Sequence, residues 1–383
     1  MNPWPTKNLG EVCEFVFGCS FKADDFNEQC KGLPVIRIGD IDKGITEKFY
    51  DKEYDDKYLV EKGDILIGLS GSIKIDKWKG EKALLNQRIV KVCNFKHEIL
   101  KDFVFYQLPS ILKRLEIQIA QGTVKNVLLP HLSNLKILVP PLKIQQKIVE
   151  RLDEIRKVQE LNDKQIELAE ELFQSLLHRE LDPKGKNWEV RKIKECLRSC
   201  QYGISLKMNS QKIGYPILRI NNLSNGEIDT SDIKYVEINR EEFEKYKLEK
   251  GDILFNRVNS YDLVGKTSIF NLEDNYVFAS YLIRLKTNSK LLLGEFLNYF
   301  LNSNPGQRAI KSKARRAVSQ ANVNARELES IKIPLPPLET QQKIVEKLSA
   351  VQEYKKKLLE RKQKLQELFE SVLDKSFKGE LEE

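Results

Sequence analysis

Basic and amide side chains gather near the end of the second half of the chain, where their types suit contact with nucleic acid. Lys and Arg bind phosphate oxygens, whereas Asn and Gln can form paired hydrogen bonds with a base edge. A bare run of charges is more often a solvated helix face. The cluster comprises Arg308, Lys311, Lys313, Arg315 and Arg316, followed by Gln320 and Asn322.

Patterns that support catalysis are absent from the sequence. The three histidines, His97, His131 and His178, are not spaced as a metal-binding pair. Cys196 and Cys200 are four residues apart on a predicted helix without a second cysteine pair, so they do not indicate a zinc site. There is no G-x-G-x-x-G or G-x-S-x-G motif and no Asn-Pro-Pro-Tyr or Asp-Pro-Pro-Tyr segment. We therefore expect a non-catalytic protein with no metal and no cofactor.

The chain consists of two copies of one unit, and the basic cluster belongs to the second copy. The segment Gln-Gln-Lys-Ile-Val-Glu occurs at 145–150 and at 341–346, a shift of 196 residues. The same shift relates 137–142 to 333–338, which both contain Pro-Pro-Leu. Upstream, the shift falls to between 182 and 188, because insertions and deletions separate the copies there. One part of each repeat therefore has a fixed length, whereas the other part varies.

The variable part of each copy, residues 1–142 and 188–338, predicts an α+β globular domain of ordinary size. Short apolar runs bounded by Gly, Asn, Asp and Pro are typical of strands. Segments of helical pattern lie between these runs. The clearest strands are 33–38, 64–69, 217–220 and 253–255, and the predicted helices lie around 100–117 and 291–312.

The fixed part of each copy predicts a long helix with a coiled-coil stripe. Neither Gly nor Pro occurs at 143–180 or 339–378, and a helix of that length spans about 55 Å. Apolar residues recur about every 3.5 positions, and Asn162 lies on the stripe where the second copy has Leu358. The stripe positions are Ile148, Ile155, Ala169 and Leu176 with Val158 and Leu172, then Ile344, Val351, Leu358, Leu365 and Val372 with Tyr354 and Leu368.

An antiparallel pair of these helices would bury both stripes within one chain. The predicted fold is therefore α+β, with two pseudo-symmetric globular α/β domains separated by two long antiparallel helices that form an intramolecular coiled coil. The predicted boundaries are 1–142 for the first domain, 143–187 for the central helix and linker, 188–338 for the second domain and 339–383 for the C-terminal helix.

Charge and composition fit a protein with a polyanionic partner. The 383 residues carry a net charge of +8, and residues 182–338 hold 26 basic against 18 acidic side chains. The helices are close to neutral. No 18-residue apolar run and no signal peptide are evident, so we expect a cytoplasmic protein without a membrane segment. Six cysteines over this length fit reduced thiols.

The repeat and its motifs resemble the specificity subunit of type I restriction-modification systems, and the resemblance covers the whole chain. Each domain begins with Trp-x-x-x-x-[Ile/Leu], at Trp4 and at Trp188, and each contains Lys-Gly-Asp-Ile-Leu. Each ends with Pro-Pro-Leu-x-x-Gln-Gln-Lys-Ile-Val, and the second also contains Gln-x-Asn-Val-Asn at 320–324. In the first domain, residues 121–126 match this last motif only loosely.

The resemblance implies that each domain is a target recognition domain, which reads one half of a bipartite, asymmetric site in double-stranded DNA. The helices would set the distance between the half-sites and dock two methyltransferase subunits, and restriction subunits would join the full complex. These partners would supply S-adenosylmethionine, ATP and the chemistry, which includes flipping the target adenine out of the duplex. The chain itself would supply only the choice of sequence.

We expect contacts with DNA from the turns that follow the Gly-Asp-Ile-Leu strands, since side chains there project from a rigid edge. Any one of the candidates could equally be structural. In the first domain they are Ser70, Gly71, Ser72, Gln87, Arg88, Gln121 and Lys125. In the second domain they are Asn256, Arg257, Asn259 and Tyr281, together with the basic and amide cluster.

Two other functions stay open on the residues alone. A nuclease could assemble carboxylates from distant positions, and a metal-dependent cleavage assay would detect it. A coiled-coil scaffold could bridge two protein partners without sequence-specific DNA binding. Such a scaffold would lack the salt dependence that phosphate contacts give to DNA binding.

Overall fold

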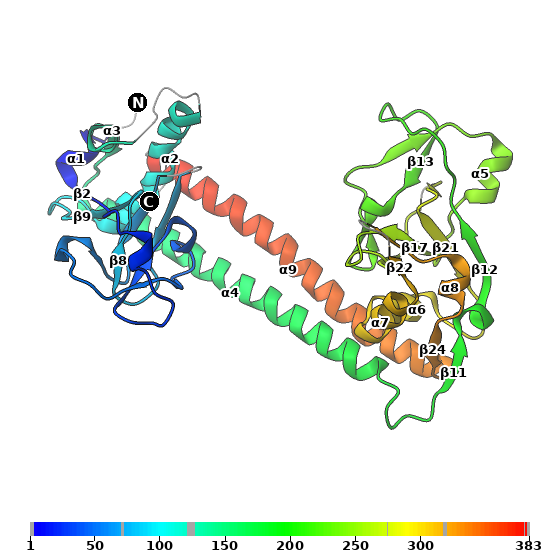
Figure 1. The fold of residues 1–383 in the computed structure, drawn as a ribbon. Helices are drawn as coiled ribbons and strands as arrows, with labels where there is room; N and C mark the ends of the chain where they lie inside the picture. Colours follow the sequence, from blue (N-terminus) through cyan, green and yellow to red (C-terminus); the bar gives the residue numbers. More distant parts are fainter. Residues whose placement is uncertain are drawn as a thin grey trace. The chain divides into compact units, whose positions relative to one another are not determined.

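The chain divides into two compact units, each of which holds one globular domain and parts of both long helices (Figure 1). Unit 1 consists of residues 1–162 and 361–383, and unit 2 consists of residues 163–360. Each unit is described by itself below. The computed structural model describes residues 4–69, 73–120, 127–273, 275–316, 320–378 and 380.

Unit 1 is built on two four-stranded sheets. The first is antiparallel, with the order β2 (Glu14–Phe17), β9 (Ile89–Cys93), β6 (Ile65–Gly68) and β7 (Lys74–Lys77). The second has the order β4 (Phe49–Tyr50), β3 (Leu33–Ile36), β8 (Ala83–Leu85) and β5 (Leu59–Val60), with β3 and β8 parallel. A separate pair joins β1 (Thr6–Asn8) to β10 (Lys136–Leu138). The helices are α1 (Leu9–Val12), α2 (Lys101–Ala120) and α3 (Leu129–Ser133).

Unit 2 repeats this arrangement. Its antiparallel sheet has the order β12 (Leu197–Tyr202), β21 (Leu282–Thr287), β17 (Ile253–Asn256) and β19 (Thr267–Ile269). The next sheet has the order β16 (Lys234–Val236), β13 (Tyr215–Leu218) and β20 (Val277–Phe278), again with one parallel pair, β13 with β20. The pair β11 (Glu189–Lys192) and β24 (Lys332–Leu335) matches β1 and β10.

Further small elements complete unit 2. A hairpin joins β14 (Leu223–Ser224) to β15 (Glu227–Ile228), and a small sheet has the order β18 (Val258–Asn259), β23 (Ala321–Asn322) and β22 (Arg315–Arg316). The helices are α5 (Arg240–Tyr246), α6 (Gly294–Asn302), α7 (Asn304–Lys313) and α8 (Ala325–Glu329).

One predicted helix of the second domain is in fact two. The segment 291–312 forms α6 and α7, with Ser303 between them as the N-cap of α7. The Ser303 hydroxyl accepts the Gly306 N–H at 3.3 Å. Pro305 follows in the first turn of α7, where its fixed backbone and missing N–H are tolerated, although they would interrupt α6.

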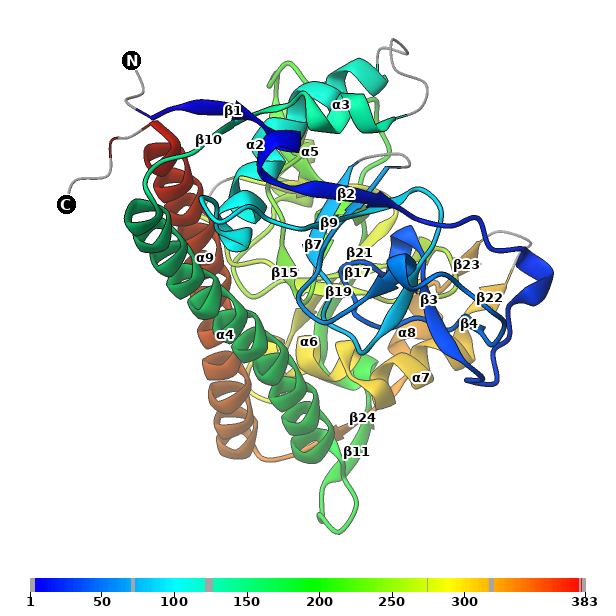
Figure 2. The same ribbon diagram turned by 90° about the vertical axis from the view of Figure 1, so that its left-hand side faces the viewer.

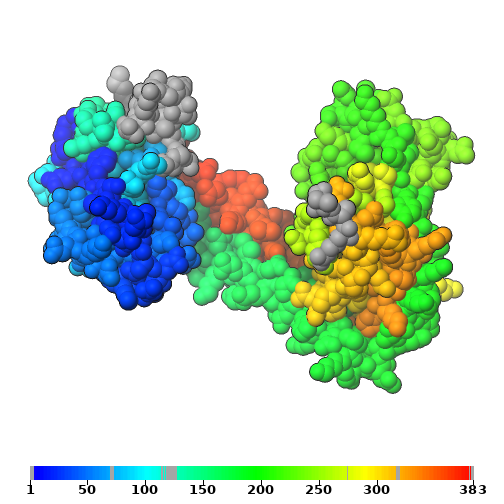
Figure 3. Space-filling view, in the orientation of Figure 1, coloured from blue at the N-terminus to red at the C-terminus, as the bar shows by residue number. Residues whose placement is uncertain are grey.

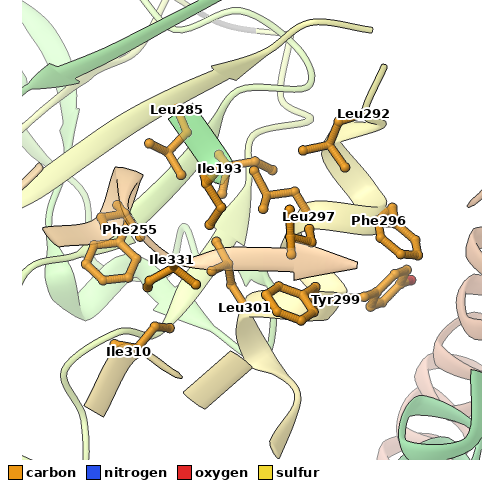
Figure 4. Close-up of a cluster of buried hydrophobic side chains, with 14 of the residues drawn as sticks. Ile193, Phe255, Leu285, Leu292, Phe296, Leu297, Tyr299, Leu301, Ile310 and Ile331 are labelled. Atoms are coloured by element: carbon orange, nitrogen blue, oxygen red, sulfur yellow. The ribbon is translucent and has the colours of Figure 1, made fainter. Parts of the chain in front are cut away.

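The core of unit 2 lies between the antiparallel sheet, α6 and the long helices (Figure 4). Ile253 and Phe255 point to this core from one face of β17, whereas Leu254 points to a second cluster on the other face. This alternation is what a strand buried on both faces requires. In unit 1, Ile65 and Ile67 lie in the core beneath α2, and Leu66 lies in the second cluster.

The two long helices are α4 (Leu142–Leu181) and α9 (Leu338–Lys378), which confirms the predicted pair. In each unit, part of α4 lies beside part of α9 (Figure 2). In unit 1, Gln159 Nε2 donates to Leu365 O at 3.2 Å. In unit 2, Lys347 pairs with Glu180 at 3.3 Å. Because higher numbers on α4 meet lower numbers on α9, the helices are antiparallel. Among the described residues, no helix combines the length and apolar character that a membrane span needs.

Half of the predicted coiled-coil stripe is displaced by one residue. Ile148, Ala169 and Leu358 are buried as predicted, and so is Asn162. In contrast, Leu172, Tyr354 and Leu368 are about half exposed. The inward positions alternate by three and four residues, so that Gln159 and Phe173 take the places assigned to Val158 and Leu172. The half-buried Gln159 is polar, so a pattern of apolar residues does not indicate this register.

Candidate nucleic-acid interface

A small sheet in unit 2 brings distant candidate residues together. β23 lies between β18 and β22, and the register pairs Val258 with Asn322 and Arg315 with Asn322. Asn259 lies opposite Ala321 in the same sheet. The polar turn after the Gly-Asp-Ile-Leu strand therefore lies beside the basic segment, although more than fifty residues separate them in the chain. The neighbouring Gln320 is exposed just before β23.

Two exposed tyrosines flank Arg257, which connects β17 to β18. The Arg257 guanidinium lies 5.0 Å from the centre of the Tyr202 ring. Its Nη1 donates to Ser280 O at 3.4 Å, and its backbone N–H donates to Tyr281 O at 3.0 Å. The side chains of Tyr202 and Tyr281 are 41% and 56% exposed. Aromatic rings and guanidinium planes of this kind can contact bases and sugars.

Several polar atoms in this region are buried without a partner among the described residues, and one of them is Asn256 Oδ1. Among the described residues, neither Arg257 Nε nor Asn322 Oδ1 has a hydrogen-bond partner. A buried donor or acceptor without a partner costs about 1–3 kcal/mol. Since Val323 N donates to Arg257 O at 2.9 Å, the two side chains come from adjoining backbone. Arg257 Nε is thus a donor, and Asn322 Oδ1 an acceptor, without a partner among the described residues.

The basic residues of the cluster fall on α7 and on the strand that follows it. Arg308 and Lys313 are exposed on α7, whereas Lys311 is half-buried with its ammonium group 5.4 Å from the centre of the Tyr261 ring. Figure 3 shows this part of unit 2, in yellow and orange, at the molecular surface. Lys and Arg presented in this way suit phosphate oxygens.

Arg315 has a partner within the protein. Its Nε lies 2.6 Å from Glu327 Oε1, although the Arg315 side chain is 78% exposed. Glu327 also accepts the Asn324 N–H at 2.8 Å, while Asn324 accepts the Glu327 N–H at 2.9 Å, which forms a capping box at the start of α8. Arg315 is therefore held in place by a carboxylate that has a second structural role. Most of the guanidinium stays open to solvent.

Unit 1 has the same backbone arrangement at the end of β6 as unit 2 has at the end of β17, but it carries different side chains there. We call this part of each unit the shared edge. Leu69 N donates to Arg88 O at 2.8 Å, as Arg257 N donates to Tyr281 O in unit 2. Gln87 and Arg88 are exposed in the turn between β8 and β9. Arg88 has a φ of 66°, a left-handed conformation that is uncommon for a residue with a side chain. The turn between β20 and β21 presents Tyr281 at the equivalent place.

In both units, a glycine directly after the outer strand of the antiparallel sheet makes the shared edge possible. This strand is β2 in unit 1 and β12 in unit 2. Gly18 N donates to Ile89 O at 2.9 Å, and Gly203 N donates to Leu282 O at 3.2 Å. A Cβ atom on Gly18 would lie 2.0 Å from Asn86 O, and one on Gly203 would lie 2.3 Å from Ala279 O. Neither contact is possible, so the close approach of strand and turn requires glycine at both positions.

Asn256, Arg316 and the candidates outside the described residues complete the predicted set. Asn256 is 1% exposed at the end of β17, and its Nδ2 donates to Leu263 O at 3.3 Å, so it is unavailable for contact with DNA. The backbone of Arg316 lies in β22, but its side chain is outside the described part of the structure. Ser70, Gly71, Ser72, Gln121 and Lys125 lie outside the described residues.

Tyr202 was missed by the sequence reasoning. It ends β12, directly before Gly203, and its hydroxyl accepts the Ala325 N–H at 2.8 Å. A signal was present, because Phe17-Gly18 and Tyr202-Gly203 form an aromatic-glycine pair in each copy. The pair lies outside the segments with the constant shift, where the repeat is hardest to align.

Metal-ligating side chains and thiols are the next groups to place. No group of three or more His, Cys, Asp and Glu side chains among them could hold a metal ion. Burial raises the pKa of the Cys13 and Cys200 thiols to about 12, so neither is a thiolate at neutral pH. The predicted helix around Cys196 and Cys200 is wrong: Cys196 ends a short 3-10 turn, and Cys200 lies in β12.

The sequence of this chain matches the model of one protein family in both of its halves. The model of the type I restriction modification DNA specificity domain matches residues 1–171 and again residues 185–368. The two matches correspond to the two repeats.

Individual relatives agree with this match. The type I restriction enzyme EcoBI specificity subunit of Escherichia coli is 24% identical over 99% of this chain and 86% of that protein. A putative type I restriction enzyme MjaX specificity subunit of Methanocaldococcus jannaschii is 39% identical over 43% of this chain and 39% of that protein. The crystal structure of a type I S subunit from M. genitalium has the same fold, with a TM-score of 0.63, 16% identity, and coverage of 98% of this chain and 96% of that one. The chain therefore belongs to the family of type I restriction-modification DNA specificity subunits, with the family domain present twice.

Proposed function

We propose that each globular domain reads one half of a bipartite DNA target, the first domain over residues 1–142 and the second over 188–338. The observation that carries this proposal is the shared edge at the ends of β6 and β17. The backbone of the edge is the same in both units, but Arg88 stands in one unit where Tyr281 stands in the other. Two copies of one scaffold with different surface residues are suited to two different half-sites, and hence to an asymmetric target.

In unit 2 the proposed interface consists of the small sheet, the two tyrosines and α7. Lys and Arg on α7 would bind phosphates and fix the position of the domain on the duplex. Arg257, Asn259 and Asn322 would then face the base edges, where Arg suits guanine and Asn suits adenine. Asn256 is not part of this interface, because it is buried. In unit 1 the proposed contacts come from Gln87 and Arg88.

The helices would serve the complex rather than the DNA bases. We propose that α4 and α9 set the distance between the half-sites and dock two methyltransferase subunits, to which restriction subunits add in the full complex. The chain would choose the sequence, and its partners would supply S-adenosylmethionine, ATP and the chemistry.

Methylation mapping tests this function directly. The chain is produced with its methyltransferase partner, and the modified sites are identified in DNA of random sequence. We expect a bipartite target with an unread gap. Tyr281→Ala and Arg257→Ala should then relax only one half, by about 5- to 150-fold for each lost base contact, and Arg88→Ala should relax only the other. The proposal is refuted if no bipartite target appears, or if a change in one domain alters both halves.

A further inference from the structure

A buried glutamine ties the first turn of each long helix to the globular domain that precedes it. Gln145 is 0% exposed at the start of α4. Its Oε1 accepts the Leu100 N–H at 2.8 Å, just before α2 begins. Its Nε2 donates to Glu98 O at 2.8 Å and to Pro140 O at 2.7 Å. One side chain thereby fixes the start of α4 against the start of α2.

Gln341 makes the same three bonds in unit 2, where it is also 0% exposed. Its Oε1 accepts the Leu293 N–H at 2.9 Å, and its Nε2 donates to Leu291 O and Pro336 O, both at 2.9 Å. Both amide hydrogens and the carbonyl oxygen are in use. Asparagine is one methylene shorter, and glutamate has no N–H to donate, so neither can replace this glutamine.

The second glutamine of each Gln-Gln pair has a different environment. Gln146 and Gln342 are exposed, and each donates to a glutamate one turn later, Glu150 at 3.2 Å and Glu346 at 3.1 Å. These are ordinary surface pairs between residues four apart on a helix. The two members of the pair therefore provide a matched comparison, with one buried in the joint and one on the surface.

A tyrosine adds a second tie between domain and helices in unit 1. Tyr106 lies on α2 and is 3% exposed. Its hydroxyl donates to Asp153 on α4, and its ring centre lies 6.0 Å from that of Phe369 on α9. One side chain from the domain therefore contacts both long helices. Burial raises the pKa of Tyr106, so the hydroxyl keeps its proton.

Unit 2 has the same tie with the two helices exchanged. Tyr299 on α6 is 7% exposed, and its hydroxyl donates to Gln352 on α9 at 2.8 Å. Its ring centre lies 6.1 Å from that of Phe173 on α4. Phe173 and Phe369 are 196 residues apart, as are Gln145 and Gln341. The residues that α4 and α9 contribute to these contacts thus belong to the part of the repeat with constant length.

We infer that Gln145 and Tyr106 in unit 1, and Gln341 and Tyr299 in unit 2, are positioning residues that hold each recognition domain in one orientation on the helices and so restrict the gap between half-sites. The inference rests on the proposed function. These four residues are different from those proposed to read DNA. The reading residues can then change without altering the joint.

The test measures the range of gap lengths that the complex accepts. The chain with its methyltransferase partner is given DNA that carries both half-sites separated by gaps that differ in steps of one base pair. For Gln341→Met, which keeps the length but loses all three bonds, methylation at the neighbouring gap lengths should rise on the order of tenfold relative to the preferred one. The half-site bases should stay the same. Gln342→Met should behave as the unaltered chain.

Each outcome decides one point. A folded Gln341→Met chain whose gap profile matches that of the unaltered chain overturns the inference and leaves the proposed function standing, as does a change in the preferred bases. If the unaltered complex modifies no bipartite target, the proposed function itself fails. If Gln341→Met does not fold, as thermal unfolding would show, Tyr299→Phe keeps the ring, loses only the hydroxyl bonds and supplies the same comparison.

Discussion

Replacing Arg315 with alanine should weaken DNA binding far more than it weakens the fold. The Arg315 side chain is 78% exposed, so its ion pair with Glu327 is a surface pair worth about 0–1 kcal/mol of unfolding free energy. We therefore expect a change of at most a few degrees in the melting temperature of the chain. The capping box formed by Glu327 and Asn324 does not need the arginine and should keep α8 intact.

The loss in DNA binding follows from the release of counterions. One lost phosphate contact makes the slope of log K against log salt less negative by about 0.9, so raising the salt fourfold should change the ratio of the two affinities by about 3.5-fold. The affinities should differ most at low salt and converge as salt increases. Fluorescence anisotropy on a labelled target, with the methyltransferase complex at several salt concentrations, gives both slopes.

Arg179→Ala is the matched control. Arg179 is 70% exposed and pairs with Glu180 at 3.1 Å, so its removal deletes the same charge and a similar ion pair on α4. Its salt slope should equal that of the unaltered chain. If Arg315→Ala leaves the slope unchanged and only lowers the melting temperature, the role of Arg315 is to support α8, and the proposed phosphate contact is wrong.

Three further predictions concern the helices, the thiols and catalysis. The hydrogen bond from Lys355 lowers the pKa of Glu170, so this pair stabilises the fold above the usual glutamate pKa and loses that effect as the pH falls from there through the lowered pKa. Glu170→Gln should therefore flatten the acid side of the melting temperature plotted against pH. A thiol reagent at pH 8 should label the exposed Cys30 in the folded chain but reach the buried Cys13, whose pKa burial raises to about 12, only after unfolding; rapid labelling of Cys13 in the folded chain would contradict its burial. The purified chain alone should transfer no tritium from S-adenosylmethionine to DNA, and transfer above that of a blank preparation would show a catalytic site in the chain.

The repeat made much of this fold predictable from the sequence. The constant shift of 196 residues and the absence of Gly and Pro defined two long helices, because these signals depend only on spacing along the chain. The inward face of α4 was harder to predict, since the half-buried Gln159 takes a place that an apolar Val158 seemed to fill. Apolar content alone cannot distinguish a shift of one residue when a polar side chain at the inward position bonds to a neighbouring helix.

The candidate interface was only partly predictable, for a related reason. Arg315 and Asn322 were found because charged and amide residues are clustered in the sequence. Asn256 was placed at the surface because it follows a strand, but its amide turns inward to the backbone of Leu263. Tyr202 was not expected at all. Its proximity to Arg257 depends on the pairing of β12, β21 and β17, which no local pattern reveals.

The division of the chain has a consequence for its synthesis. Unit 2 is one continuous segment, whereas unit 1 needs both the first 162 residues and the last 23. The core of unit 1 is completed by Phe369, Val372 and Phe377. During translation, most of unit 1 is therefore synthesised before unit 2, whereas its α9 segment is synthesised after unit 2. The apolar face of α2 stays uncovered by α9 until all of unit 2 has been made. A premature stop near the C-terminus would thus damage the N-terminal domain.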